Sequence, residues 1–239
     1  MIHPHNLLYA PPSCITSTSI LFSGTYCHYI TDVLRLQPGD SIQVTDGRGK
    51  VFAACISSTT RSKVLASITA QSVIGPPASV RVDIAFAPIK GSRNDLIIEK
   101  GTELGVRRFM LFPTRFSVVK NPGAAKVKHL ERIAVSAMIQ SQRFYLPSVE
   151  LIKKTKSLVQ EFSQYDLALL GDPSGSREIP GGKRSLLWIV GPEGGLAPEE
   201  INLFQDHGAV PVSLGSARLR SETAALSGLV KILVAYQSL

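Results

Sequence analysis

The sequence has 239 residues, of which 44% are hydrophobic, so the chain can bury a substantial core and is not disordered throughout. It carries 26 Lys and Arg against 18 Asp and Glu, a net charge of +8, which suits an acidic partner such as nucleic acid. No apolar run approaches the roughly 18 residues that a membrane span needs. Residues 1–10 lack the features of a signal peptide. We therefore expect a cytoplasmic protein that is not embedded in a membrane.

The cysteines and histidines form no pattern typical of a metal site. Cys14, Cys27 and Cys55 are odd in number and have no C-x-x-C spacing, and the five histidines are scattered without an H-E-x-x-H motif. The sequence therefore predicts neither a disulfide framework nor a bound metal.

Residues 1–74 have the pattern of a small β-barrel. Short alternating runs at 41–44, 51–56 and 64–68 predict strands, and Asp-Gly-Arg-Gly at 46–49 predicts a turn between the first two. The Gly-Pro-Pro-Ala-Ser segment at 75–79 is too rich in proline for the interior of a helix or strand. We therefore expect it to link two domains.

Residues 80–239 alternate between strand and helix patterns. Continuous apolar runs are typical of strands buried on both faces of a parallel sheet, with helices packed on each side. The predicted strands are 80–87, 109–112, 167–170, 186–190 and 210–214, and the predicted helices are 93–104, 126–142, 151–162, 198–208 and 221–237.

Two loops at predicted strand ends carry the clearest functional signal. The first is Gly-Pro-Glu-Gly-Gly-Leu at 191–196, and the second runs from 214 to 225 with the sequence L-G-S-A-R-L-R-S-E-T-A-A. Ligands of open α/β sheets bind at the carboxyl ends of strands, and a helix N-terminus favours anions. Each loop alone is equally compatible with an ordinary turn or a capped helix.

Basic residues concentrate in one stretch, since residues 90–143 carry eleven Lys and Arg against four Asp and Glu. A basic stripe is the usual footprint of a polyanion. Charge alone leaves two interpretations open, nucleic-acid binding and a solvated helix face.

At the two loops the sequence resembles the RsmE family of 16S ribosomal RNA uracil-N3 methyltransferases, within the SPOUT superfamily. Further similar segments are H-Y-I-T-D-V-L-R-L-Q-P-G-D at 28–40, K-G-T-E-L-G-V at 100–106, S-V-V-K at 117–120 and Q-S-Q-R at 140–143. The chain departs from the family pattern at 1–5, at Ile139 and at 216–218. The resemblance covers nearly the whole chain in the same order.

The resemblance implies a PUA-like RNA-binding β-barrel over 1–74, a linker over 75–79 and a trefoil-knotted methyltransferase domain over 80–239. It also implies a homodimer and S-adenosylmethionine (SAM) as methyl donor. The residues that it assigns to the cofactor are Leu170, Gly171, Gly191, Pro192, Glu193, Gly194, Gly195, Leu214, Gly215, Leu219 and Arg220.

Uracil N3 must lose a proton before it can attack a methyl group, which leaves negative charge on the ring. Arg218 and Arg220 are the candidate donors to that charge. Glu222 either accepts the proton or orients its neighbours, and Glu193 has a structural role. The candidate RNA-binding residues are Arg35, Arg107, Arg108, Arg115, Lys120 and Arg143.

Two other functions remain open at this point. A related knotted methyltransferase could modify another RNA site or a ribose 2′-oxygen. A non-catalytic protein could bind RNA through the barrel and the basic stripe alone. SAM binding separates the enzymes from the binding protein, and analysis of the modified nucleoside separates the two enzymes.

Overall fold

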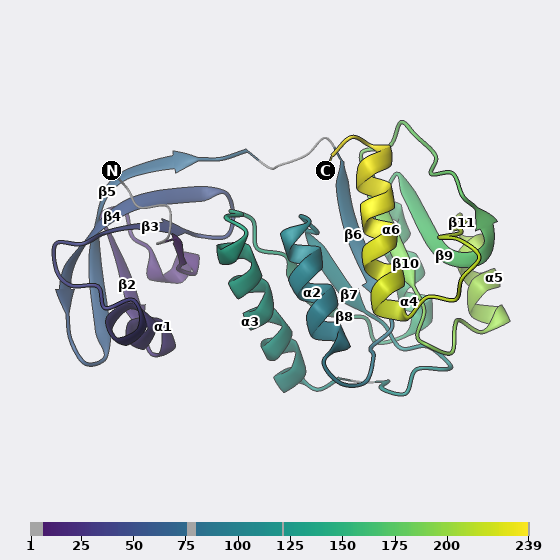
Figure 1. Cartoon of the computed structure of the whole chain (residues 1–239), viewed down its shortest axis with the longest axis horizontal. Coiled ribbons are helices and arrows are strands. Elements are labelled where there is room, and N and C mark those ends of the chain that lie inside the picture. Colours follow the sequence, from purple (N-terminus) through teal and green to yellow (C-terminus); the bar gives the residue numbers. More distant parts are fainter. Residues whose placement is uncertain (1–6, 76–79, 121, 239) are drawn as a thin grey trace. The chain divides into compact units, whose positions relative to one another are not determined.

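The computed structural model describes residues 7–75, 80–120 and 122–238 (Figure 1). The chain divides into two compact units, one of Met1–Pro76 with Met138–Leu146 and one of Pro77–Ala137 with Pro147–Leu239. The predicted domain boundaries at 74 and 80 stay predictions, and residues 76–79 of the predicted linker lie outside the described residues.

The first unit is built on a five-stranded sheet in the order β1-β3-β4-β5-β2. Its pairs are antiparallel except β1 with β3, and alternate residues such as Ile42 and Val44 point into a core that a short helical segment also covers. The elements are β1 Leu7–Tyr9, β2 Ser19–Ser23, α1 Thr25–His28, β3 Ser41–Thr45, β4 Lys50–Thr59 and β5 Lys63–Val73.

The predicted turn at 46–49 forms and is held by its own side chain. Asp46 Oδ1 accepts hydrogen bonds from the backbone N–H groups of Arg48 (2.7 Å) and Lys50 (3.1 Å). Gly49 has a φ of 93°, which favours glycine, and its N–H donates to the Phe144 carbonyl at 2.9 Å. The segment Met138–Leu146 therefore joins the first unit through this turn.

The second unit contains a six-stranded sheet in the order β11-β9-β10-β6-β7-β8, and every pair in it is parallel. The central strand β10 is buried along its length, as its continuous apolar sequence predicts. The predicted α/β class with a parallel sheet is thus confirmed. The strands are β6 Arg81–Phe86, β7 Arg108–Leu111, β8 Ser148–Leu151, β9 Leu167–Ser176, β10 Ser185–Val190 and β11 Val210–Val212.

Helices cover both faces of this sheet. Phe204 of α5 packs with Leu158 of α4 and with Phe112 on one face. On the other face α6 contacts β10, β6 and α2 (Figure 1). The helices are α2 Arg93–Glu103, α3 Ala124–Gln140, α4 Thr155–Glu161, α5 Pro198–Asp206 and α6 Ser221–Ala235.

The predicted helix over 151–162 is wrong in its first part. Leu151 ends the edge strand β8, where it pairs with Leu111, and the following N–H of Ile152 donates to the Leu111 carbonyl at 2.8 Å. The helix α4 begins only at Thr155, whose hydroxyl donates to the Pro113 carbonyl at 2.6 Å. Main-chain pairing with β7 overrides the helical pattern here.

Two kinds of feature are missing from the described part of the chain. None of its helices has the length and apolar character to span a membrane. Within the same residues, no three His, Cys, Asp or Glu side chains are grouped so that they could hold a metal ion. The trefoil knot implied by the resemblance stays a prediction.

A close helix–strand contact holds α6 on the sheet. Gly228 lies in the buried face of α6, and a Cβ atom at this position would overlap the indole ring of Trp188 on β10. The Trp188 Nε1–H donates to the Ala224 carbonyl of α6 at 3.3 Å. Glycine at 228 therefore lets the helix approach the strand closely, although glycine disfavours a helix by about 1 kcal/mol relative to alanine.

We expect Gly228→Ala to lower the melting temperature, because overpacking costs about 1–3 kcal/mol and outweighs the gain in helix propensity. The net cost of up to about 2 kcal/mol corresponds to a shift of up to about 8 °C for a chain of this size. Thermal denaturation measures it. The control is Ser227→Ala at the neighbouring exposed position, which should leave the melting temperature unchanged or slightly raised. A higher melting temperature for Gly228→Ala contradicts the packing argument.

Candidate functional site

Three adjacent parallel strands end at the same edge of the second unit's sheet. β9 lies between β11 and β10, so the residues that follow these strands meet at their carboxyl ends. The loop at 191–196 follows β10, the loop at 213–220 follows β11, and Gly171 and Asp172 follow Leu170, the last residue of β9 that pairs with β10. This edge is where ligands of open α/β sheets bind.

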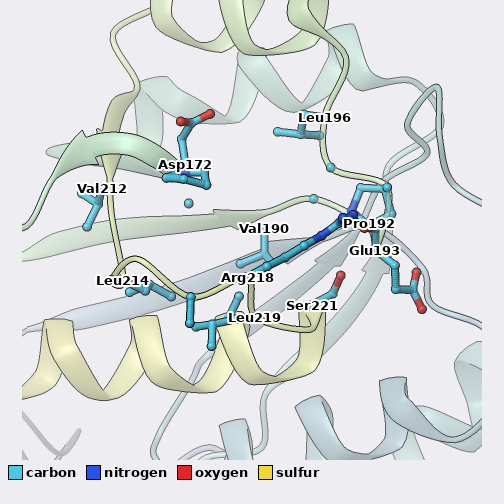
Figure 2. A pocket seen from close by; sticks show the side chains of 18 of the residues that line it. Asp172, Val190, Pro192, Glu193, Leu196, Val212, Leu214, Arg218, Leu219 and Ser221 are labelled. Carbon is cyan, nitrogen blue, oxygen red and sulfur yellow. Dashed lines mark hydrogen bonds between the residues drawn. The ribbon is translucent and has the colours of Figure 1, made fainter.

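A cavity of about 460 Å³ lies between these segments (Figure 2). Most of the residues that the sequence assigned to the cofactor line it. They are Gly171, Gly191, Pro192, Glu193, Gly194, Gly195, Leu214, Gly215 and Leu219. Leu170 does not line the cavity, because it is fully buried in β9. Arg220 is exposed between two lining residues, Leu219 and Ser221, without lining the cavity itself.

Sequence reasoning missed half of the cavity wall. Asp172 and Pro173 could have been found, because they follow the predicted strand 167–170 as the signature loops follow theirs. Five more belong to the two signature loops, although no role was assigned to them individually: Leu196, Ser216, Ala217, Ser221 and Ala224. Val190, Ile201 and Val212 come from β10, α5 and β11, and only the folded chain brings them to the cavity.

The backbone of the cavity wall requires glycine at several positions. Gly195 has a φ of 78° and its N–H donates to the Pro192 carbonyl at 2.9 Å, which closes a tight turn. A Cβ at Gly191 would lie 2.9 Å from Leu196 Cγ, and Gly215 has a φ of 136° with open space beside it. The glycines thus shape a loop that leaves room for a ligand against the backbone.

Arg218 does not project freely into solvent. Its Nη2 donates to the backbone carbonyl of Glu193 at 2.8 Å, and Figure 2 shows the side chain extended toward Pro192 and Glu193. Arg218 therefore connects the two signature loops across the cavity.

A third arginine, which sequence reasoning missed, contacts the same loop. Arg93, the first residue of α2, donates from Nη1 to Glu193 Oε1 at 2.7 Å. Its Nε also lies 3.6 Å from Glu222 Oε1. No motif marked Arg93, because its partners are distant in sequence.

Glu222 is almost entirely buried at the start of α6. Its side chain is 10% exposed, and it does not line the cavity. Its second oxygen, Oε2, is buried without a hydrogen-bond partner among the described residues. The carboxylate therefore faces Arg93 rather than the cavity.

The predicted RNA-binding residues of the second unit fall at opposite edges of its sheet. Arg107 and Arg108 precede or begin β7, at the amino edge, whereas Arg115 and Lys120 follow β7, at the carboxyl edge where the cavity lies. Lys120 is exposed, and Arg115 is exposed while paired with Glu199 at 3.2 Å. The basic stretch is therefore not one continuous stripe.

Arg108 is engaged inside the second unit. It binds Glu150 at 2.6 Å and Glu161 at 2.8 Å, its side chain is only 19% exposed, and these carboxylates raise the pKa of the guanidinium against the effect of burial. Two internal partners neutralise its charge. We therefore leave Arg108 out of the RNA-binding set proposed below.

The remaining two candidates belong to the first unit. Arg35 is exposed and has a φ of 54°, so the chain turns sharply at this residue. Arg143 is half-buried, and burial lowers the pKa of its guanidinium.

Comparisons with known proteins agree with this geometry. The family described as "RNA methyltransferase domain" matches residues 76–232, and the family described as "RNA methyltransferase PUA domain" matches residues 27–69. The chain thus contains an RNA methyltransferase domain and its PUA domain, which confirms the predicted class of enzyme.

Similar proteins with known names show which family of RNA methyltransferases the chain belongs to. The chain is 31% identical over 225 residues to ribosomal RNA small subunit methyltransferase E of Bacillus subtilis, with 88% of each chain covered. It is 32% identical over 241 residues to the protein of the same name from Synechocystis, covering 95% of this chain and 77% of the relative. The chain belongs to the ribosomal RNA small subunit methyltransferase E family, and the resemblance read from its motifs is confirmed.

Solved structures share the fold over nearly the whole chain. A probable rRNA-methyltransferase from Porphyromonas gingivalis is 31% identical with a TM-score of 0.83, covering 97% of this chain and 98% of that one. A protein of Legionella pneumophila, solved in complex with the cofactor SAM, is 28% identical with a TM-score of 0.88, covering 96% and 97% of the two chains.

Proposed function

We propose that the protein transfers a methyl group from SAM to N3 of a uridine in 16S ribosomal RNA. The observation that carries this proposal is the cavity between the two signature loops at the carboxyl edge of the sheet. Support comes from the relatives named ribosomal RNA small subunit methyltransferase E and from the SAM bound in the similar Legionella structure.

The cavity fits a molecule of the size and chemistry of SAM. Its volume of about 460 Å³ falls in the usual range for small-molecule sites, about 300–1,000 Å³. Glycine backbone and apolar side chains such as Leu196 and Leu214 suit a flat adenine ring, and the polar backbone of the loops suits hydrogen bonding. When bound there, SAM supplies a methyl group already made electrophilic by its sulfonium.

The chain's own residues then have to stabilise a uracil that has lost its N3 proton. Arg220 is exposed at the rim of the cavity and precedes the first residue of α6, where the helix dipole also favours negative charge. We assign to its guanidinium the role of donating hydrogen bonds to the negatively charged uracil oxygens. Arg218 holds the loop at 191–196 through the Glu193 carbonyl. Glu222 orients its neighbours and is not the proton acceptor, because it is buried and faces Arg93. The N3 proton then passes to solvent water.

Phosphate contacts position the RNA so that the target base reaches the cavity. Arg115 and Lys120 lie at the cavity's edge of the sheet and take this role in the second unit, and Arg35 and Arg143 take it in the first. We further propose that the protein acts as a homodimer in the cytoplasm, where its ribosomal substrate is found.

The direct test is nucleoside analysis of 16S ribosomal RNA from cells with and without the gene. We expect N3-methyluridine to disappear when the gene is deleted and to return when it is restored. Loss of a ribose-methylated nucleoside instead would assign the enzyme to a different target atom.

Gly215→Val should weaken SAM binding strongly while the protein stays folded. Valine tolerates the φ of 136° at this position poorly, so the loop must rearrange and the cavity wall with it. Isothermal titration calorimetry measures the affinity, and circular dichroism checks the fold. Gly208→Val, at an exposed helix end with a similarly positive φ of 91°, is the matched control and should bind SAM normally. Unchanged SAM affinity in Gly215→Val would remove this loop from the site.

Arg220→Ala should lower turnover by about a hundredfold or more, the usual cost of removing one charge-stabilising donor, with little change in SAM affinity. Glu222→Gln should reduce turnover only slightly, and raising the pH should not restore it. A proton acceptor behaves differently, because its loss is partly compensated at high pH as more uracil ionises unaided. Single-turnover methylation between pH 6 and 10 distinguishes the two. A steep, pH-rescued loss in Glu222→Gln would make this residue the base.

Reversing charge at Arg115 and Lys120 should weaken RNA binding and flatten its salt dependence by about 0.7–0.9 per lost phosphate contact. SAM affinity should not change. Lys183→Glu with Arg184→Glu makes the same change in net charge at two exposed residues that directly precede β10, at the opposite edge of the sheet, and serves as the control. Equal losses in the two double variants would show a general charge effect instead of a local contact.

A further inference from the structure

Arg93 lies where the two signature segments meet. Its Nη1 donates to Glu193 Oε1 at 2.7 Å, and its Nε lies 3.6 Å from Glu222 Oε1. Glu193 belongs to the loop that follows β10, and Glu222 belongs to the first turn of α6. One guanidinium therefore links two walls of the site.

The position of Arg93 is electrostatically unfavourable for its own helix. It is the first residue of α2, where the helix dipole repels a cation, and Ser92 before it makes no side-chain cap. The buried Asn94 nevertheless fixes this helix end, because its side chain exchanges hydrogen bonds with the N–H and the carbonyl of Ile89 at 2.9 and 2.6 Å. The two carboxylates compensate the charge that the helix end does not favour.

Breaking the ion pair costs Glu222 more than Arg93, because Glu222 is the more buried of the two side chains. Its side chain is only 10% exposed, and its Oε2 has no hydrogen-bond partner among the described residues. A buried carboxylate that loses its counter-charge is strongly destabilising. Arg93 is 39% exposed and has a second, closer partner in Glu193. The ion pair therefore stabilises chiefly the start of α6, because Arg93 neutralises the buried carboxylate of Glu222 there.

We propose that Arg93 is a positioning residue for methyl transfer. It holds the 191–196 loop through Glu193 and the start of α6 through Glu222, so that the cavity wall and the neighbouring Arg220 keep their relative places. Arg93 acts through these two carboxylates and not by contact with the reacting atoms. This inference rests on the proposed function, because the site that it positions is the one assigned above to SAM and uracil.

The first arm of the test measures SAM affinity by calorimetry. We expect Arg93→Ala to bind SAM at least tenfold more weakly than the wild type, and Arg93→Lys to recover part of the loss, because one ammonium keeps the charge but cannot reach both carboxylates. In the Arg93→Ala background, Glu193→Gln should weaken SAM binding little further, because the ion pair between residues 93 and 193 is already lost. Lys100→Ala, which removes an exposed ion-paired side chain from the same helix, is the control for SAM affinity.

The second arm measures melting temperatures without SAM or RNA. In the wild-type background Glu222→Gln should lower the melting temperature, because it breaks an ion pair. In the Arg93→Ala background the same substitution should raise it, because it removes a buried charge without a counter-charge. This reversal of sign does not depend on the enzyme's substrate.

Two results would overturn the proposal. One is wild-type SAM affinity in Arg93→Ala, and the other is an equal drop in melting temperature for Glu222→Gln in both backgrounds. Failure of the wild-type protein to bind SAM would instead count against the proposed function, and the melting arm would still decide whether Arg93 compensates Glu222.

Discussion

The parallel pairing of β10 with its two neighbours is the constraint on which the site depends. Ile189 of β10 pairs with Leu170 of β9, and Val190 pairs with Phe86 of β6. The residues that come next, Gly171, Gly191 and Ala87, therefore lie at nearly the same level of the sheet. The cavity and the start of α2 both follow from this register, and a slip of one residue would turn buried side chains of β10 to the opposite face.

The two edges of the same sheet have different chemistry. At the carboxyl edge glycine loops enclose a cavity, and arginines reach toward backbone and carboxylate oxygens. Near the amino edge polar groups pair inside the protein: the Tyr165 hydroxyl donates to Asp83 Oδ2 at 2.7 Å, and burial raises the pKa of both groups. Asp83 Oδ1 is buried without a hydrogen-bond partner among the described residues. Arg108 with its two glutamates belongs to this second group. Arginines of the same basic stretch thus contact a cavity loop at one edge, as Arg93 does, and internal carboxylates at the other, as Arg108 does.

Sequence reasoning reached those parts of the fold that local patterns encode. The apolar runs of β6, β9 and β10 and the glycine-containing loops after β10 and β11 are visible in the residues themselves. The edge strand β8 was missed, because its four residues bury a single large side chain, Val149, and gain their structure from pairing with β7.

The site was predictable where its residues stand in a motif and not where the fold alone assembles them. The loop at 191–196 was found, whereas Arg93 was not, because its two partners follow it by about a hundred residues or more. Glu222 closely follows Arg218 and Arg220 in the sequence, and this position does not reveal that its side chain is buried. The separation of Arg107 from Arg115 depends on which end of β7 each one flanks, which a count of charges cannot show.

Trp188 gives the molecule an internal optical reporter. It is the one tryptophan of the chain, it is fully shielded from solvent on β10, and its indole N–H bonds to the carbonyl of Ala224, a residue of the cavity wall. Its ring also packs beneath Gly228 of α6. Intrinsic fluorescence excited at the indole band therefore comes from a single point between the central strand and the last helix, and its emission wavelength reports whether that helix is seated.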